Sequence, residues 1–241
     1  MVAFQKSQGK ADTMSSQFFL YAFLVLSSVH VLGEFLQDPI RKKIRMSTKP
    51  LLMPALIAYN LLHTDDPNWW IVGGLFLGWI GDVVLMFPKI AIMFLIGLAS
   101  FLVGHALFIY AFLQSSSYLQ GMPMWFMGLA AIFAFAAAAF FTYFKPHLTG
   151  ENADKKVPVA LYASIIVAMS YTSLAIWLNG SGSGVFFVAL PFIGSLCFIV
   201  SDFLLANQLF IKPFKFDQAI IMLTYLAAQF FIAQGYLPYP F

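Results

Sequence analysis

Two acidic residues lie in segments of the sequence that otherwise contain no charge. Asp82 lies within residues 70–87, and Asp202 lies within residues 185–210. A carboxylate in hydrocarbon is destabilising by at least about 3 kcal/mol, so such a residue is normally functional. The contexts match, because glycine or serine precedes each aspartate and four apolar residues follow it. The two acids predict acid–base chemistry, with polar packing between helices as the alternative.

Other polar residues recur near these acids or deeper in the same kind of segment. Each has a structural alternative: a lysine at the membrane surface can extend its ammonium to water, an acid four residues after a histidine can pair with it, and buried polar side chains can join helices. Beside these alternatives we expect contacts with a substrate from Lys49, Glu34, His105, Tyr225 and Gln229.

The composition is that of an integral membrane protein. Of 241 residues, 61% are hydrophobic and only 10% are charged, against roughly 25% charged in soluble domains. The single cysteine, Cys197, excludes an internal disulfide and any CxxC motif. Histidine pairs with metal-site spacing, a GxSxG elbow, a phosphate-binding glycine loop and nucleic-acid-binding motifs are all lacking. The sequence therefore predicts an all-α membrane protein with no metal, cofactor or nucleic-acid partner.

Apolar segments of sufficient length predict eight membrane-spanning helices. We expect a tail over residues 1–17 and one transmembrane domain over 18–241, with spans at 18–37, 50–63, 70–87, 90–113, 123–144, 157–179, 185–209 and 217–236. Eleven of the thirteen Lys and Arg residues lie in alternate connections. By the positive-inside rule these connections face the cytoplasm, and both termini face the other side.

The two halves of the chain resemble each other. The third and seventh predicted spans share the aspartate motif, and the second and sixth begin with a lysine and a proline. This pattern favours a 4+4 repeat related by an axis along the membrane normal, with chance similarity of apolar segments as the alternative. Counted along each helix from its cytoplasmic end, Asp82 is ~9 Å deep and Asp202 is ~15 Å deep.

Four stretches resemble the lysoplasmalogenase family, the YhhN-like membrane proteins. They are Gly81-Asp82-Val-Val-Leu, the spacing Gly97…Phe101…His105, Gly194 to Asp202 with Ser201-Asp202 at its end, and Ile221 to Gln229 with its Thr-Tyr-x-x-Ala-Gln motif. The resemblance covers about residues 45–235. It adds Ser201 to the expected substrate contacts, and it leaves Tyr110 outside the site because Phe108 occupies the family's aromatic position.

The resemblance implies an eight-span enzyme that hydrolyses the vinyl ether of lysoplasmalogens, without a metal. Such cleavage protonates the β-carbon of the vinyl ether, and water captures the resulting oxocarbenium ion. It needs one neutral carboxylic acid and one carboxylate, the division of labour of glycosidases. Asp82 and Asp202 are the expected pair, and Lys49 or Arg45 is expected to hold the lipid phosphate.

Transport of a lipid or small solute is the competing class, with the acids as proton carriers. Transporters of this kind have discontinuous helices, marked by Gly or Pro at matching mid-span positions in the two halves. The first half contains several mid-span glycines, but no matched pair of mid-span prolines is present. The partners expected in either class are a lysophospholipid and membrane lipids.

Overall fold

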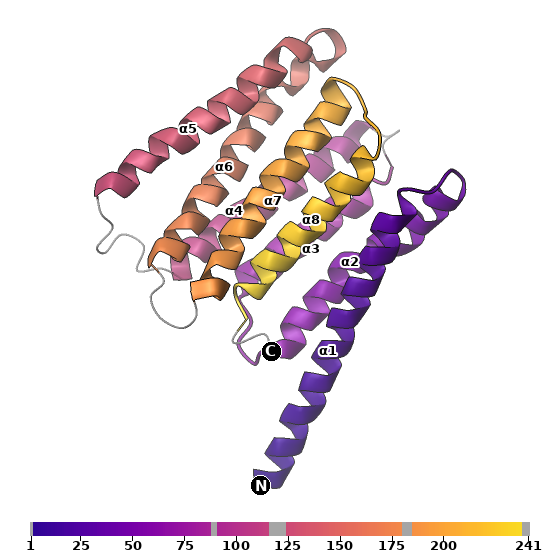
Figure 1. The fold of residues 1–241 in the computed structure, drawn as a ribbon, viewed down its shortest axis with the longest axis vertical. Helices are drawn as coiled ribbons and strands as arrows, with labels where there is room; N and C mark the ends of the chain where they lie inside the picture. Colours follow the sequence, from indigo (N-terminus) through magenta and orange to yellow (C-terminus); the bar gives the residue numbers. More distant parts are fainter. Residues whose placement is uncertain (1, 88–90, 116–123, 180–184, 238–241) are drawn as a thin grey trace. The chain divides into compact units, whose positions relative to one another are not determined.

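A computed structural model describes residues 2–87, 91–115, 124–179 and 185–237. These residues form eight α-helices and two short 3₁₀ helices, and no strand (Figure 1). The all-α prediction is confirmed. The elements are α1 Val2–Gly33, α2 Ile40–His63, α3 Trp69–Val84, α4 Ala91–Ser115, α5 Met124–Phe144, η1 Lys145–His147, η2 Gly150–Lys155, α6 Lys156–Asn179, α7 Val185–Phe210 and α8 Asp217–Gln234.

Most helix boundaries lie within three residues of the predicted spans, and the exceptions are both ends of α1 and the start of α2. Helix α2 begins at Ile40 rather than at residue 50, so the basic segment Arg41–Lys49 is helical and not a loop. Lys and Arg are good helix formers, and the helix continues beyond its apolar part until Pro39. Helix α1 covers Val2–Gly33, against the expected 18–37. The expected starts at residues 90 and 123 lie outside the described residues.

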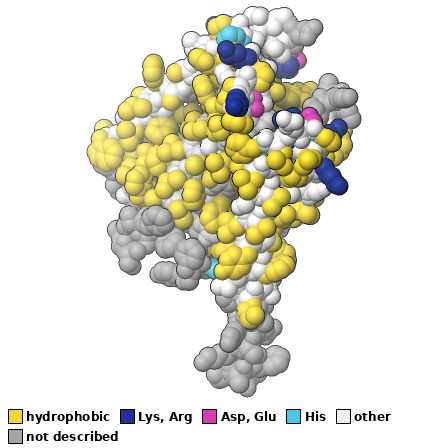
Figure 2. Space-filling view, turned by 45° about the vertical axis from the view of Figure 1, so that its right-hand side comes forward, with side chains coloured by type: hydrophobic (Ala, Val, Ile, Leu, Met, Phe, Trp, Pro, Cys, Tyr) yellow, Lys and Arg dark blue, Asp and Glu magenta, His cyan; other side chains and the backbone are white. Residues whose placement is uncertain are grey.

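Five helical segments of the described chain are long and apolar enough to cross a membrane: Met14–Gly33, Ile92–Gln114, Met124–His147, Asn152–Leu178 and Val188–Phe210. Helix α3 is apolar but shorter. Charged and amide side chains lower the mean hydropathy of helices α2 and α8. The effect is largest in the basic first turns of α2. Hydrophobic side chains make up most of the face drawn in Figure 2. The eight-span count stays a prediction.

The chain divides into two compact units, residues 1–104 with 236–241 and residues 105–235. The boundary falls inside α4. In the first unit α1 packs on α2, and α2 packs on α3. The core between them contains large side chains that are fully buried, among them Leu52, Leu56, Ile71 and Leu75. Helix α3 begins with a cap: the Asn68 side chain accepts hydrogen bonds from the amides of Trp70 and Ile71.

In the second unit α5, α6, α7 and α8 pack on one another in chain order, as Figure 1 shows. A small apolar cluster of Phe144, Leu148 and Val159 closes the end where η1 and η2 join α5 to α6. The α7–α8 contact depends on Gly194, because a Cβ there would lie 2.8 Å from the Ala228 carbonyl oxygen. The small residue lets the two backbones approach, as is common in membrane helices.

Candidate active site

Asp82 lies in the last turn of α3 and is buried. The Lys49 ammonium on α2 lies 3.1 Å from its Oδ1 atom, and the Lys49 side chain is only 15% exposed. Lys49 therefore forms an ion pair with Asp82 in a largely buried position. A buried carboxylate needs such a partner, because an unpaired one is strongly destabilising.

Two prolines of α2 help to align this ion pair. Pro54 has no N–H, so the helix cannot use the Pro50 carbonyl four residues earlier. The indole Nε1 of Trp79 on α3 donates to that carbonyl at 2.8 Å. Trp79 is three residues before Asp82, and Pro50 follows Lys49, so this hydrogen bond fixes the register between the two helices close to the ion pair.

A second ion pair joins the end of α1 to α2. The Arg45 Nε atom donates to Glu34 Oε1 at 2.8 Å, and Nη2 donates to Oε2, so the contact is bidentate. Glu34 is buried, with a side chain that is 1% exposed, whereas the Arg45 side chain is 34% exposed. Gly33 brings α1 against α2 here, because a Cβ at Gly33 would lie 2.6 Å from the Ile44 side chain.

His30 completes the buried polar set of the first unit. The Thr48 hydroxyl donates its only proton to the Ile44 carbonyl. The 2.7 Å hydrogen bond between His30 Nδ1 and Thr48 Oγ1 must therefore use a proton on His30 Nδ1. His30 Nε2 lies 3.8 Å from Glu34 Oε1, so the two residues share one helix face as their spacing predicts, but no hydrogen bond joins them. This set, the first-unit polar set, contains His30, Glu34, Arg45, Thr48, Lys49 and Asp82.

Asp202 has a different environment in the second unit. It lies in the second half of α7 and shares a hydrogen bond with the Tyr162 hydroxyl on α6. Its Oδ2 atom is buried and has no hydrogen-bond partner within the described parts of the chain. The carboxyl group therefore has one phenol partner and one open position. Neither Lys nor Arg forms an ion pair with it in the described residues.

Aromatic rings extend from Tyr162 to the other expected residues of this unit. The His105 ring on α4 lies 5.5 Å from the Tyr162 ring and 4.8 Å from the Phe198 ring, edge to face in both cases. Phe198 in turn lies 5.7 Å from Tyr225 on α8. The Gln229 side-chain amide donates to the Tyr225 hydroxyl at 3.1 Å, so these two residues share one helix face as expected.

Ser201 is buried, and its hydroxyl donates to the Ile221 carbonyl on α8 at 3.1 Å. This bond ties α7 to α8 one residue before Asp202. The second-unit polar set thus contains His105, Tyr162, Ser201, Asp202, Tyr225 and Gln229, with Phe198 between its rings.

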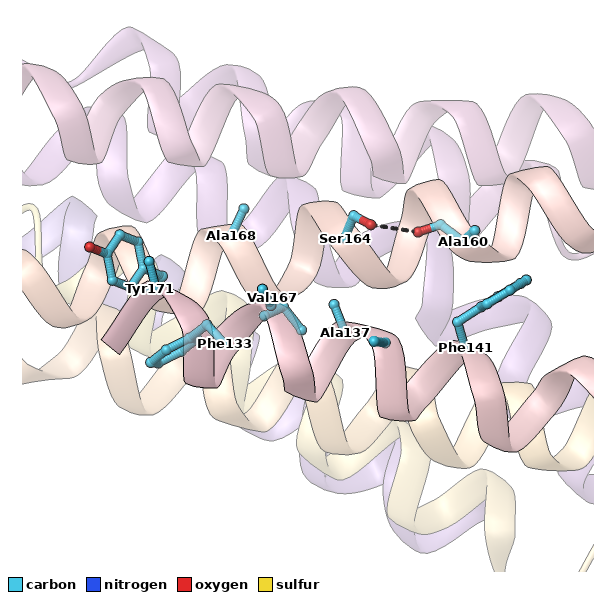
Figure 3. A pocket seen from close by; sticks show the side chains of 11 residues that line it. Phe133, Ala137, Phe141, Ala160, Ser164, Val167, Ala168 and Tyr171 are labelled. Atoms are coloured by element: carbon cyan, nitrogen blue, oxygen red, sulfur yellow. Dashed lines mark hydrogen bonds between the residues drawn. The ribbon is translucent and has the colours of Figure 1, made fainter. Parts of the chain in front are cut away.

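An apolar groove of about 500 Å³ lies between α5 and α6 (Figure 3). Its wall is mainly alanine, with Phe133, Phe141 and Tyr171 around it. The Ser164 hydroxyl in the groove is used by its own helix, donating to the Ala160 carbonyl at 2.8 Å. The groove holds no acid or base, so it is not a candidate for the reaction. Nowhere in the described chain do three His, Cys, Asp or Glu side chains gather as a metal site would require.

The structure thus divides the eight expected site residues between two sets, one in each unit. Arg45, Thr48 and Tyr162 are in contact with them but were not among those eight. The sequence offers a weak signal for Arg45, as one of several basic residues, and none for Tyr162, which is an ordinary tyrosine in an apolar segment.

Several apolar helices of spanning length, with charged side chains buried between helices, define an integral membrane protein that crosses the bilayer several times. The model of the YhhN family matches residues 44–236, and the chain belongs to this family. The family resemblance in the sequence motifs is therefore confirmed.

Named relatives cover most of the chain. It is 30% identical to human lysoplasmalogenase TMEM86B (Homo sapiens), over 78% of this chain and 74% of that protein. It is 26% identical to the Rattus norvegicus protein of the same name, over 92% of this chain and 84% of the relative. The lysoplasmalogenase of Mycobacterium tuberculosis is 31% identical, over 80% and 68% respectively. No solved structure matches the chain.

Proposed function

We propose that this protein is a lysoplasmalogenase, which hydrolyses the vinyl ether of a lysoplasmalogen to a fatty aldehyde and a glycerophospho-headgroup. One observation carries the proposal: in a chain of this family, each unit holds one of the two aspartates that lie in apolar segments, and the two have different partners. Asp82 faces an ammonium, and Asp202 faces a phenol with its Oδ2 atom open. The relatives named above support the substrate class.

The different partners support different roles for the two acids. Asp202, with an open oxygen and no cation, is the proposed general acid. It gives its proton to the β-carbon of the vinyl ether, and the electron pair of the C=C bond forms the new C–H bond. The product is an oxocarbenium ion. Asp82, beside Lys49, is the proposed carboxylate that accepts a proton from water as the water oxygen bonds to the α-carbon.

The hemiacetal formed in this way then collapses. Its hydroxyl proton is lost, the aldehyde C=O forms, and the bond to the glycerol oxygen breaks as that oxygen takes up a proton. No oxidant, reductant or metal enters the balance. The two roles require the acids to start in opposite protonation states, with Asp202 as the neutral acid and Asp82 as the carboxylate beside the Lys49 ammonium.

The experiment is detection of the products. Purified protein in detergent would be incubated with an alkenyl-glycerophosphocholine or alkenyl-glycerophosphoethanolamine, and the aldehyde and the headgroup would be measured by mass spectrometry. A saturated alkyl ether of the same length is the matched control, because it has no C=C bond whose electron pair could accept the proton. Release of the headgroup from the alkyl ether at the same rate, or from neither lipid, would contradict the proposal.

The same proposal includes the membrane topology and the repeat. The basic first turns of α2 favour a cytoplasmic position for the start of that helix, with both termini on the other side and four helices in each repeat. Single cysteines at residues 42 and 43, in a Cys197→Ala background, should react only with a reagent supplied from the cytoplasmic side. The transport alternative expects discontinuous helices, whereas α7 continues unbroken through Pro191.

A further inference from the structure

The guanidinium of Arg45 is held along one edge only. Its Nε and Nη2 atoms donate to the two oxygens of buried Glu34. A guanidinium has five N–H groups, so three remain, two of them on Nη1. Within the described residues Nη1 makes no hydrogen bond or ion pair, and a third of the side chain is exposed. The unused donors form a planar pair suited to an oxyanion such as a phosphate.

Lys49, the other cation expected to hold the lipid phosphate, already forms an ion pair with the buried carboxylate of Asp82. Its ammonium lies 3.1 Å from Asp82 and is largely buried. Arg45 and Lys49 are four residues apart on α2, so they share one face and are separated by ~6 Å along the helix axis. A similar length separates the phosphate of a lysolipid from its vinyl ether, because the three glycerol carbons lie between them.

The surroundings of Arg45 also favour an anion. The first turns of α2 and the residues paired with them contain five cations and three acids, so a net positive charge remains: Arg41, Lys42, Lys43, Arg45 and Lys49 against Glu34, Asp38 and Asp82. Glu34 does not abolish the site, because it orients the guanidinium while leaving Nη1 unused.

We propose that Arg45, oriented by Glu34, binds the phosphate of the lysolipid and so determines the preference for phosphorylated substrates, in place of Lys49. This inference rests on the proposed function for its substrate. Arg45 is then a binding residue and Glu34 a positioning residue. The phosphate is held alike in the ground state and the transition state, so the contact should act on KM rather than on kcat.

The test compares two substrates that differ only in the phosphate: an alkenyl-glycerophosphocholine and the corresponding alkenylglycerol. Arg45→Gln should raise KM for the phospholipid at least ~10-fold, since the charge-assisted hydrogen bonds to the phosphate are lost. Its kcat/KM for the alkenylglycerol should stay within about twofold. Lys43→Gln, which removes one exposed cation from the same helix, is the matched control and should leave both within about twofold.

Arg45→Gln leaves Glu34 buried without its partner, and this variant can fail to fold. The double variant Glu34→Gln, Arg45→Gln removes both charges and should fold while losing the phosphate preference. Glu34→Gln alone should raise KM for the phospholipid only, with kcat kept. An equal loss on both substrates in the double variant would assign Arg45 a structural role and overturn the inference, as would an unchanged KM.

Binding of a saturated analogue separates this inference from the proposed function. Calorimetry with an alkyl-glycerophosphocholine needs no turnover, and the wild type should bind it at least ~10-fold more tightly than the double variant does. Inactivity towards both alkenyl substrates with binding that depends on Arg45 would reject the proposed function and keep the inference. Activity on both alkenyl substrates with binding that does not depend on Arg45 would keep the proposed function and reject the inference.

Discussion

The two units place a buried aspartate in opposite electrostatic environments. In the first, Asp82 is buried beside an ammonium, within a set that contains three charged partners and a histidine. In the second, Asp202 is surrounded by rings and uncharged donors, with the Tyr162 hydroxyl as its partner. Sequence contexts that look equivalent therefore give one carboxylate matched by a cation and one that is not, and this difference underlies the proposed division of acid and base roles.

The largest effect is expected from removing either acid. Asp82→Asn and Asp202→Asn should each lower turnover of a lysoplasmalogen by at least ~100-fold, because proton transfer commonly contributes 10²–10⁴-fold. The measurement is initial-rate assay of aldehyde release, normalised to protein that elutes as a single folded species. A near wild-type rate in one variant only would leave a single acid in the chemistry and remove the paired mechanism.

The next largest effect is expected on the thermal stability of variants that alter the partner of Asp82 or the charge of Asp202. Lys49→Met takes the ammonium away from buried Asp82, and removing one partner of a buried ion pair is typically destabilising by ~3–5 kcal/mol. Addition of Asp82→Asn to that variant should recover part of the loss, since the carboxylate charge is then removed as well. Asp202→Asn, which leaves no charge unpaired, should change thermal unfolding far less. Equal shifts for Lys49→Met and Asp202→Asn would show that the contrast between the units is not electrostatic.

Tyr162→Phe tests the partner of Asp202 and should have a moderate effect. The ring and its contact with His105 stay, while one hydrogen bond of ~1 kcal/mol is lost. We expect turnover to fall ~5–10-fold if that bond orients the acid. Tyr171→Phe is the control on the same helix, because its hydroxyl donates to the Phe126 carbonyl at 3.3 Å rather than to an acid. A similar loss in both variants would point to a packing effect.

The last comparison concerns two glycines in the helices that carry the aspartates, Gly81 in α3 and Gly194 in α7. A Cβ at Gly194 would lie 2.8 Å from a backbone oxygen, whereas one at Gly81 would lie 2.6 Å from the ring of Phe101. A backbone cannot move aside as a ring can, so Gly194→Ala should lower stability by ~1–3 kcal/mol and Gly81→Ala by less. Thermal unfolding of the two variants measures the difference, and the reverse order would contradict this account of the packing.

Much of the fold followed from local patterns. Apolar runs of spanning length predict helices directly, because in hydrocarbon the backbone must satisfy its own hydrogen bonds. The spacing of Tyr225 and Gln229 placed them on one face, and the i, i+4 spacing of His30 and Glu34 did the same. The start of α2 was predicted wrongly because charge was taken to end the helix, although Lys and Arg favour helices and Pro39 marks the actual start.

The sequence by itself determined that this is an all-helical membrane protein of the YhhN family, with two acids in apolar segments. Only the tertiary structure decided the partners: Lys49 for Asp82, Arg45 for Glu34 and Tyr162 for Asp202. The physical reason is that residue spacing determines contacts within one helix, whereas contacts between helices depend on how each is rotated about its axis. Helices that are apolar on nearly every side carry little local information about that rotation.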